Sequence, residues 1–286
     1  MVAFSLYPRG PFSLAAAAAF AEGFPATDAR RDGDELSFAF ALEGDGQTVG
    51  VRLQERDGAV HGEATGASGA LETRVRDAVE AILSLDVDGS GWADVAARDP
   101  VVAAVQADRP GLRPVLFWTP YEAAAWTIIG QRIRMSQAAA VKQRLAEELG
   151  ETIEFDGQRL PAFPSPERLA ALPGGVRGLT ARKEEQLRAL GRAALAGALD
   201  RARLRSMGRE AADAALRKLP GIGPFSAELV WIRGAGDPDA LPGNERRIAA
   251  IVRDRYGAGA QLEDVAAAWR PYRSWVVLML RAAGGG

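Results

Sequence analysis

Cysteine is absent from the 286-residue chain, and histidine occurs once, at His61. Without thiols the protein can form no disulfide, cysteine nucleophile or cysteine-ligated iron–sulfur cluster, and a single imidazole makes no zinc site. His61 falls within an expected strand, where it is predicted to be a half-exposed sheet residue. No run reaches the roughly 18 consecutive apolar residues of a membrane span. These absences favour a protein of the reducing cytoplasm with no membrane partner.

An excess of basic residues is also missing, because 35 Lys and Arg face 37 Asp and Glu, for a net charge of -2. A strongly basic balance would have favoured a nucleic-acid partner over the whole surface. A local basic face is nevertheless enough for phosphate contacts. The hydrophobic share of 48% and the charged share of 25% are typical of globular proteins, and the length allows two cores.

The alternation of apolar residues predicts an α+β unit in residues 1–112. Strands are expected at 4–7, 36–42, 49–53 and 59–65, with helices at 12–24 and 71–85. From Pro120 onward the spacing favours helices only, including one long helical segment over 121–150 and others at 166–172, 180–198, 209–219, 262–270 and 272–283. We therefore expect an N-terminal α+β domain, 1–112, followed by an all-α domain, 113–286.

The most informative stretch runs from Leu216 to Ile248, with Leu219-Pro220-Gly221-Ile222-Gly223 at its centre. Two glycines one residue apart, between two predicted helices, allow a tight turn that exposes successive backbone N–H groups. Together with the positive end of the next helix, these groups form an anion site. No strand precedes the glycines, which argues against a dinucleotide-binding turn. A plain turn between two helices is the simpler alternative.

Several segments are similar to a known family. The string LPGIGPFSA resembles the helix-hairpin-helix, expected near 215–233, of the HhH-GPD superfamily of DNA base-excision glycosylases. Further likeness to the bacterial 3-methyladenine DNA glycosylase II branch lies in the segments 110–113, 121–131, 179–183 and 269–274. The resemblance implies a TATA-binding-protein-like N-terminal domain followed by an all-α HhH-GPD domain. It also implies a DNA N-glycosylase of base excision repair that flips and hydrolyses off alkylated, 3-methyladenine-like or otherwise damaged bases.

The same resemblance assigns DNA contacts. Main-chain amides of the hairpin are expected to bind phosphates, Gln131 precedes the wedge that fills the gap left by a flipped base, and Arg132 stands at the wedge position. The expected DNA-binding residues are Gly221, Ile222, Gly223, Ser226, Gln131 and Arg132. The main-chain carbonyls of Arg217, Leu219 and Ile222 are expected to hold a structural Na⁺ or K⁺, with no other cofactor. The expected partner is double-stranded DNA with damaged bases, bound by a monomeric, cytoplasmic, nucleoid-associated bacterial protein.

The catalytic position follows from the family's aspartate at a helix start, which aligns with Glu245. A carboxylate there can stabilise the positive charge that develops on the sugar when the glycosidic bond breaks. Glutamate adds a methylene to the family's aspartate, so a damaged-DNA-binding protein with weak or no catalysis is the alternative function. A helical module that binds a protein partner is a third, weaker one. Asp237 and Asp239 are less favoured substitutes, because they look like loop residues.

The base pocket is expected to be lined by Phe225, Leu229, Trp126, Arg281 and Asn244. Phe225 stands two residues after the second hairpin glycine, where bifunctional members carry a Schiff-base lysine, so lyase activity is not expected. Arg281 falls where the branch has an aromatic residue. It can repel a cationic purine or form a salt bridge with Glu245.

Overall fold

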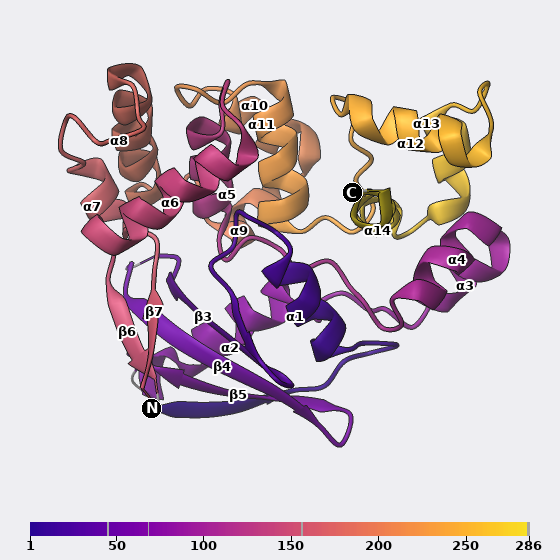
Figure 1. Ribbon diagram of the computed structural model, residues 1–286, viewed down its shortest axis with the longest axis horizontal. Helices are drawn as coiled ribbons and strands as arrows, with labels where there is room; N and C mark the ends of the chain where they lie inside the picture. The colour runs from indigo at the N-terminus through magenta and orange to yellow at the C-terminus, as the bar shows by residue number, and fades with distance from the viewer. Residues whose placement is uncertain (45, 68, 156, 285–286) are drawn as a thin grey trace.

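A five-stranded antiparallel sheet organises the N-terminal part of the computed structural model, which describes residues 1–44, 46–67, 69–155 and 157–284 (Figure 1). The strand order is β1-β5-β4-β3-β2. The strands are β1 (Val2–Leu6), β2 (Arg30–Asp32), β3 (Glu35–Ala41), β4 (Thr48–Arg56) and β5 (Ala59–Thr65). Helices α1 (Leu14–Glu22) and α2 (Glu72–Ile82), the latter preceded by a 3₁₀ turn η1 (Gly69–Leu71), share one apolar core with this sheet.

The rest of the chain is mostly helical, as predicted (Figure 1). Its helices are α3 (Trp92–Arg98), α4 (Pro100–Asp108), α5 (Pro120–Ile129), α6 (Met135–Leu149), α7 (Pro166–Ala170), α8 (Ala181–Leu195), α9 (Arg201–Met207), α10 (Arg209–Leu216), α11 (Pro224–Leu229), the π-helical η2 (Val230–Ala235), α12 (Arg246–Tyr256), α13 (Leu262–Val265), the 3₁₀ turn η3 (Ala266–Trp269) and α14 (Arg273–Gly284).

The long helical segment expected over 121–150 is wrong as a single helix. It consists of α5 and α6, which are separated by a turn in which Arg132 adopts the left-handed backbone conformation, φ +58°. Gly130 is the C-cap residue of α5. Glycine is unfavourable inside a helix because it loses more conformational freedom than other residues, so it favours the end of the helix here. A hairpin of β6 (Thr152–Phe155) and β7 (Gln158–Pro161), not predicted from the sequence, packs Phe155 and Leu160 against Ala39 of the sheet.

Two further cores lie among the helices. The central one gathers α5, α6, α8 and the α10–α11–η2 segment, whereas α3 and α4 share a core with α12 and α14. Arg113 is fully buried at the start of the helical part. Its guanidinium donates to the carbonyls of Ser84 and Val87 at 3.1 Å and of Pro11 at 2.9 Å, which connects the helical part to the sheet-bearing part.

Within the described residues, no helix combines the length and the apolar character that crossing a membrane requires. Asp57-Gly58, a dipeptide typical of hairpin turns, joins β4 to β5, and both residues have positive φ angles. A similar dipeptide, Asp45-Gly46, includes a residue outside the described ranges.

Candidate active site and nucleic-acid interface

The glycine-containing turn lies between α10 and α11, as the sequence predicts. Gly221 has φ +88°, which favours glycine, and a Cβ at this position would lie 2.8 Å from the Gln186 side-chain carbonyl carbon. Pro224 is the first residue of α11. Among the described residues, the N–H groups of Gly221 and Gly223 have no acceptor, whereas that of Ile222 donates to Leu219 O at 3.1 Å. The turn therefore presents unpaired amides to an anion.

A hydrogen bond connects this turn to the loop between α5 and α6. The side-chain amide of Gln131 donates to Gly221 O at 2.7 Å. Lys183 Nζ donates to Ile129 O at 2.7 Å, which caps the C-terminal end of α5. Arg132 is exposed beside these contacts. The structure thus brings together the predicted phosphate-binding turn and the predicted wedge residue on one side of the molecule.

A cavity of about 590 Å³ opens next to the turn. It collects most of the predicted pocket residues although they are far apart in the sequence: Trp126, Phe225, Leu229, Glu245 and Arg281, together with Gln131 and Ser226. The Phe225 side chain is 48% exposed, while Trp126 is buried in the wall. A cavity with aromatic walls and one carboxylate has the character of a small-molecule or base site.

Glu245 is the N-cap residue of α12, forms no side-chain cap hydrogen bond, and lines the cavity. Its side chain is only 13% exposed, and Oε1 lies 2.6 Å from Nη1 of Arg281 on α14. Burial raises the pKa of Glu245 above its usual value, and the Arg281 guanidinium partly offsets this increase. Of the two alternatives for Arg281, repulsion of a cationic purine or a salt bridge with Glu245, the structure shows the salt bridge.

The segment before Glu245 is fixed by a second, buried carboxylate. Glu228 on α11 accepts the backbone N–H groups of Gly243, at 2.7 Å, and of Asn244, at 3.0 Å. Arg209 approaches Glu228 at 3.4 Å and donates to Leu241 O at 2.8 Å. These contacts hold the loop that leads into α12 against the hairpin helix, and so determine where Glu245 lies.

The chain is similar in sequence to characterised repair proteins, although no protein-family model matches it. It is 27% identical over 204 residues to DNA-3-methyladenine glycosylase of Bacillus subtilis, which covers 68% of this chain and 67% of that protein. Identity to DNA-3-methyladenine glycosylase 2 of Escherichia coli is 30% over 177 residues, 60% of each chain. In fold it matches the 3-methyladenine DNA glycosylase of Archaeoglobus fulgidus, with TM-score 0.80, 19% identity, and 97% of this chain and 96% of that chain covered.

The chain resembles DNA-3-methyladenine glycosylases in both sequence and fold. The resemblance to HhH-GPD glycosylases that the motifs indicated is thereby confirmed. The glycosylase fold places the sheet on one side of the helices and the hairpin on the other (Figure 1). Residues of the hairpin helix α11 and of the start of α12 line one cavity.

Three predicted or considered residues lie elsewhere. Asn244 is exposed at the end of the loop and does not line the cavity, so the structure does not support it as a pocket residue. Asp237 accepts from Trp231 Nε1 at 2.8 Å. The Asp239 carboxylate accepts hydrogen bonds from Nε and Nη2 of Arg273, each at 2.9 Å. Both aspartates lie in the loop between η2 and α12, as predicted, and are engaged by Trp231 of η2 and Arg273 of α14.

Among the cavity residues that were not foreseen from the sequence, three stand out by their chemistry. Phe24, from the loop after α1, brings the N-terminal part into the pocket wall. Arg233 on η2 and Glu228 on α11 also line it. The available signal was the occurrence of two charged residues in the otherwise apolar run from Ala227 to Ala235. No local pattern in the sequence points to Phe24.

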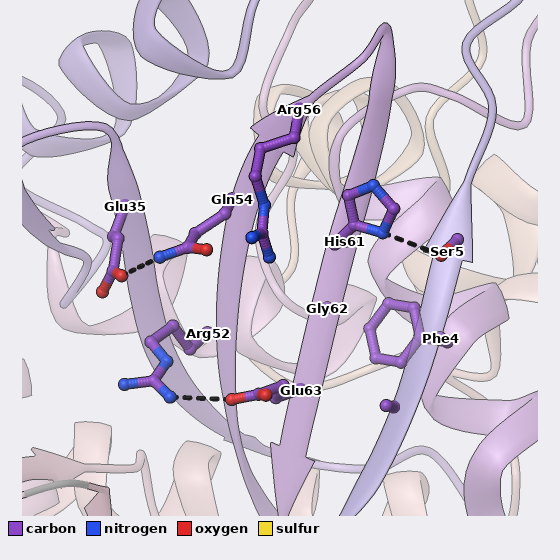
Figure 2. A pocket seen from close by; sticks show the side chains of 10 residues that line it. Phe4, Ser5, Glu35, Arg52, Gln54, Arg56, His61, Gly62 and Glu63 are labelled. Carbon is purple, nitrogen blue, oxygen red and sulfur yellow. Dashed lines mark hydrogen bonds and ion pairs between the residues drawn. The ribbon is translucent and has the colours of Figure 1, made fainter.

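A second hollow, of about 420 Å³, lies on the open face of the sheet (Figure 2). Its polar side chains contact each other: Arg52 Nη2 lies 2.7 Å from Glu63, and His61 Nδ1 lies 3.0 Å from Ser5 Oγ. His61 is partly exposed on β5, as predicted. Because its charges are largely paired across strands, this hollow is a solvated sheet face.

Proposed function

We propose that the protein is a monofunctional DNA N-glycosylase of alkylation repair, which hydrolyses alkylated, 3-methyladenine-like bases from duplex DNA. The observation that carries this proposal is the position of Glu245, a largely buried carboxylate, in the same cavity as Trp126 and Phe225 and beside the hairpin. The relatives' names add support, since those proteins are DNA-3-methyladenine glycosylases. The unpaired amides of Gly221 and Gly223 would bind DNA phosphates without reading sequence.

The reaction begins with the base leaving the stack, because a cavity cannot reach it within the duplex. Arg132 would fill the gap, and its left-handed backbone conformation directs it from a short, fixed loop. The base enters between Trp126 and Phe225. Since a base alkylated at a ring nitrogen is already cationic, it leaves as a neutral molecule with little acid assistance. Glu245 stabilises the oxocarbenium-like sugar and receives the proton of the attacking water.

Three finer points belong to the same proposal. Base removal proceeds without lyase chemistry, because no lysine is among the described residues that line the cavity. An alkali cation would bind the carbonyls of Arg217, Leu219 and Ile222. Leu219 O already accepts the N–H of Ile222 at 3.1 Å and retains a second lone pair for the cation. The protein acts as a monomer.

The test is release of free base from a panel of lesion-containing duplexes. We expect release of methylated purines by the wild type and a loss on the order of 100-fold or more in Glu245→Gln, which keeps the size but not the charge. The alternative, a protein that binds damage without turnover, predicts salt-sensitive DNA binding with no base release. Full release by Glu245→Gln would contradict the assignment of Glu245. Trapping of a covalent complex with borohydride would contradict the absence of lyase activity.

A further inference from the structure

The loop after α1, residues 23–29, carries part of the cavity wall. The Phe24 side chain lines the cavity, and its ring centre lies 6.5 Å from that of Trp126 and 5.3 Å from that of Phe117, both in edge-on arrangements. The same ring centre lies 4.4 Å from the guanidinium carbon of Arg233. These contacts persist only while the backbone that carries the ring keeps its place. The position of the loop therefore determines the shape of this wall.

Local hydrogen bonds hold the loop to the end of α1. The Phe24 N–H donates to Ala21 O at 3.1 Å, and the Thr27 hydroxyl donates to Ala21 O at 2.7 Å and to Phe24 O at 2.9 Å. They form a compact turn, but they connect the loop only to itself and to its own helix. Ala26 packs in the central helical core, and an apolar contact of this kind has no fixed direction. A directional contact with the helical part is needed to place the turn beside the cavity.

That directional contact is a buried cluster of three charges. Lys142 Nζ on α6 lies 2.6 Å from Oδ2 of Asp28, which belongs to the loop, and 3.3 Å from Oε2 of Glu122 on α5. The Lys142 and Glu122 side chains are 2% and 3% exposed, and that of Asp28 is 23% exposed. Two carboxylates, one from each half of the chain, thus share a single ammonium group.

The ion pair between Lys142 and Asp28 acts mainly on geometry. A buried ion pair contributes little net stability, because the cost of removing both charges from water offsets most of their attraction. Its short, charge-assisted hydrogen bond is nevertheless strong, and any other position of the loop loses this bond. The loop is therefore held in the one arrangement in which Asp28 reaches Lys142.

We propose that Lys142 is a positioning residue of the base cavity: through Asp28 it holds the loop after α1, and with it the Phe24 ring, in the cavity wall. The proposal rests on the proposed glycosylase function. Lys142 does not itself line the cavity, whereas Met135, two turns earlier at the start of α6, does. One helix thus aligns two parts of the wall, one directly and one through the ion pair.

The first experiment measures single-turnover release of 3-methyladenine from a duplex by the full-length protein. Asp28→Ala and Lys142→Met should each lower the rate by about 10-fold, since small displacements in a reaction site are costly, while the DNA dissociation constant changes by less than about threefold. Asp28→Asn keeps an acceptor for Nζ and should retain part of the rate. Asp32→Ala is the matched control, because Asp32 is exposed on β2 and has no ion-pair partner among the described residues.

A double-variant cycle separates positioning from a general loss of stability. If Asp28 acts through the Phe24 ring, adding Asp28→Ala to Phe24→Ala should lower the rate by less than about twofold further. A second measurement needs no activity. Hydrogen exchange at the Phe24 and Thr27 amides should be about 10-fold faster in Asp28→Ala, with unchanged exchange at the amides of Ala17 and Ala18 within α1.

Several outcomes would overturn the proposal. They are a wild-type rate in Asp28→Ala, a full 10-fold effect of Asp28→Ala in the Phe24→Ala background, or unchanged exchange at Phe24 and Thr27. If Lys142→Met does not fold, the Asp28 variants decide the question. A wild type that releases no base would instead refute the glycosylase function, and the exchange measurement would still decide whether the ion pair holds the loop.

Discussion

Replacing Glu228 with glutamine tests whether the buried carboxylate on α11 sets the position of Glu245. The carboxylate accepts two backbone N–H groups, at 2.7 and 3.0 Å, and an amide has only one acceptor oxygen. The glutamine NH₂ group must therefore face the N–H of Gly243 or of Asn244, and one charge-assisted hydrogen bond is lost. Such a bond contributes about 1.5–3 kcal/mol to stability. At about 2 °C for each kcal/mol in a chain of this size, the melting temperature should fall by roughly 3–6 °C.

The effect on catalysis should exceed the effect on substrate binding. Release of the loop before α12 lets Glu245 move, and a displacement of about 1 Å can cost on the order of 100-fold in rate. The hairpin amides that bind phosphate are unchanged. We therefore expect Glu228→Gln to lower the single-turnover rate by about 10- to 100-fold, while the DNA dissociation constant changes by less than about threefold.

The assay is base release from a lesion-containing duplex at saturating protein, together with DNA binding by fluorescence anisotropy and thermal unfolding. Glu210→Gln is the matched control, because Glu210 is exposed on α10 and has no ion-pair partner among the described residues. A Glu228→Gln rate equal to that of the wild type, with the expected fall in melting temperature, would refute the positioning role. So would an equal fall in the rate of the control.

Two other predictions concern charge and backbone. The Glu245 carboxylate must be ionised to act, and its pKa is raised by burial and lowered by Arg281. Activity should therefore fall as the pH drops through this raised value, and Arg281→Met should move the fall to higher pH. A pH–rate profile with an unmoved acid limb would contradict this. Gly221→Ala places a Cβ at φ +88° and 2.8 Å from Gln186, which should destabilise the fold by about 1–2 kcal/mol and weaken DNA binding. Gly259→Ala, where a Cβ meets nothing within 4 Å, should change neither quantity.

Local patterns predicted the elements better than they predicted the site. Alternation identified β3, β4 and β5 because each strand has one face on the core, and the glycine turn was found because its conformation requires glycine. The likeness of the N-terminal part to the TATA-binding protein stays a prediction. The short strand β2, whose residues are all exposed, carries no apolar signal. The β6–β7 hairpin was missed because few of its residues are buried.

The pocket was only partly predictable because its walls come from four distant parts of the chain. Glu245, Phe225 and Arg281 were found by their spacing from the hairpin and by the resemblance to the family. Phe24 and Arg233 gain their importance only from tertiary contact, since nothing in the sequence indicates that an aromatic loop after α1 covers a cation on η2. A resemblance to a family identifies positions that the family shares, and it does not identify positions that are particular to this chain.

Phe24 has a consequence for how the two halves of the chain depend on each other. The ring that covers Arg233 belongs to the sheet-bearing half, whereas the guanidinium and the carboxylate of Glu245 belong to the helical half. A change in the loop after α1, distant in the sequence from the phosphate-binding turn, can therefore reshape a wall of the cavity that the helices alone do not complete. The sheet-bearing half is thus part of the cavity and not only a support beneath the helices.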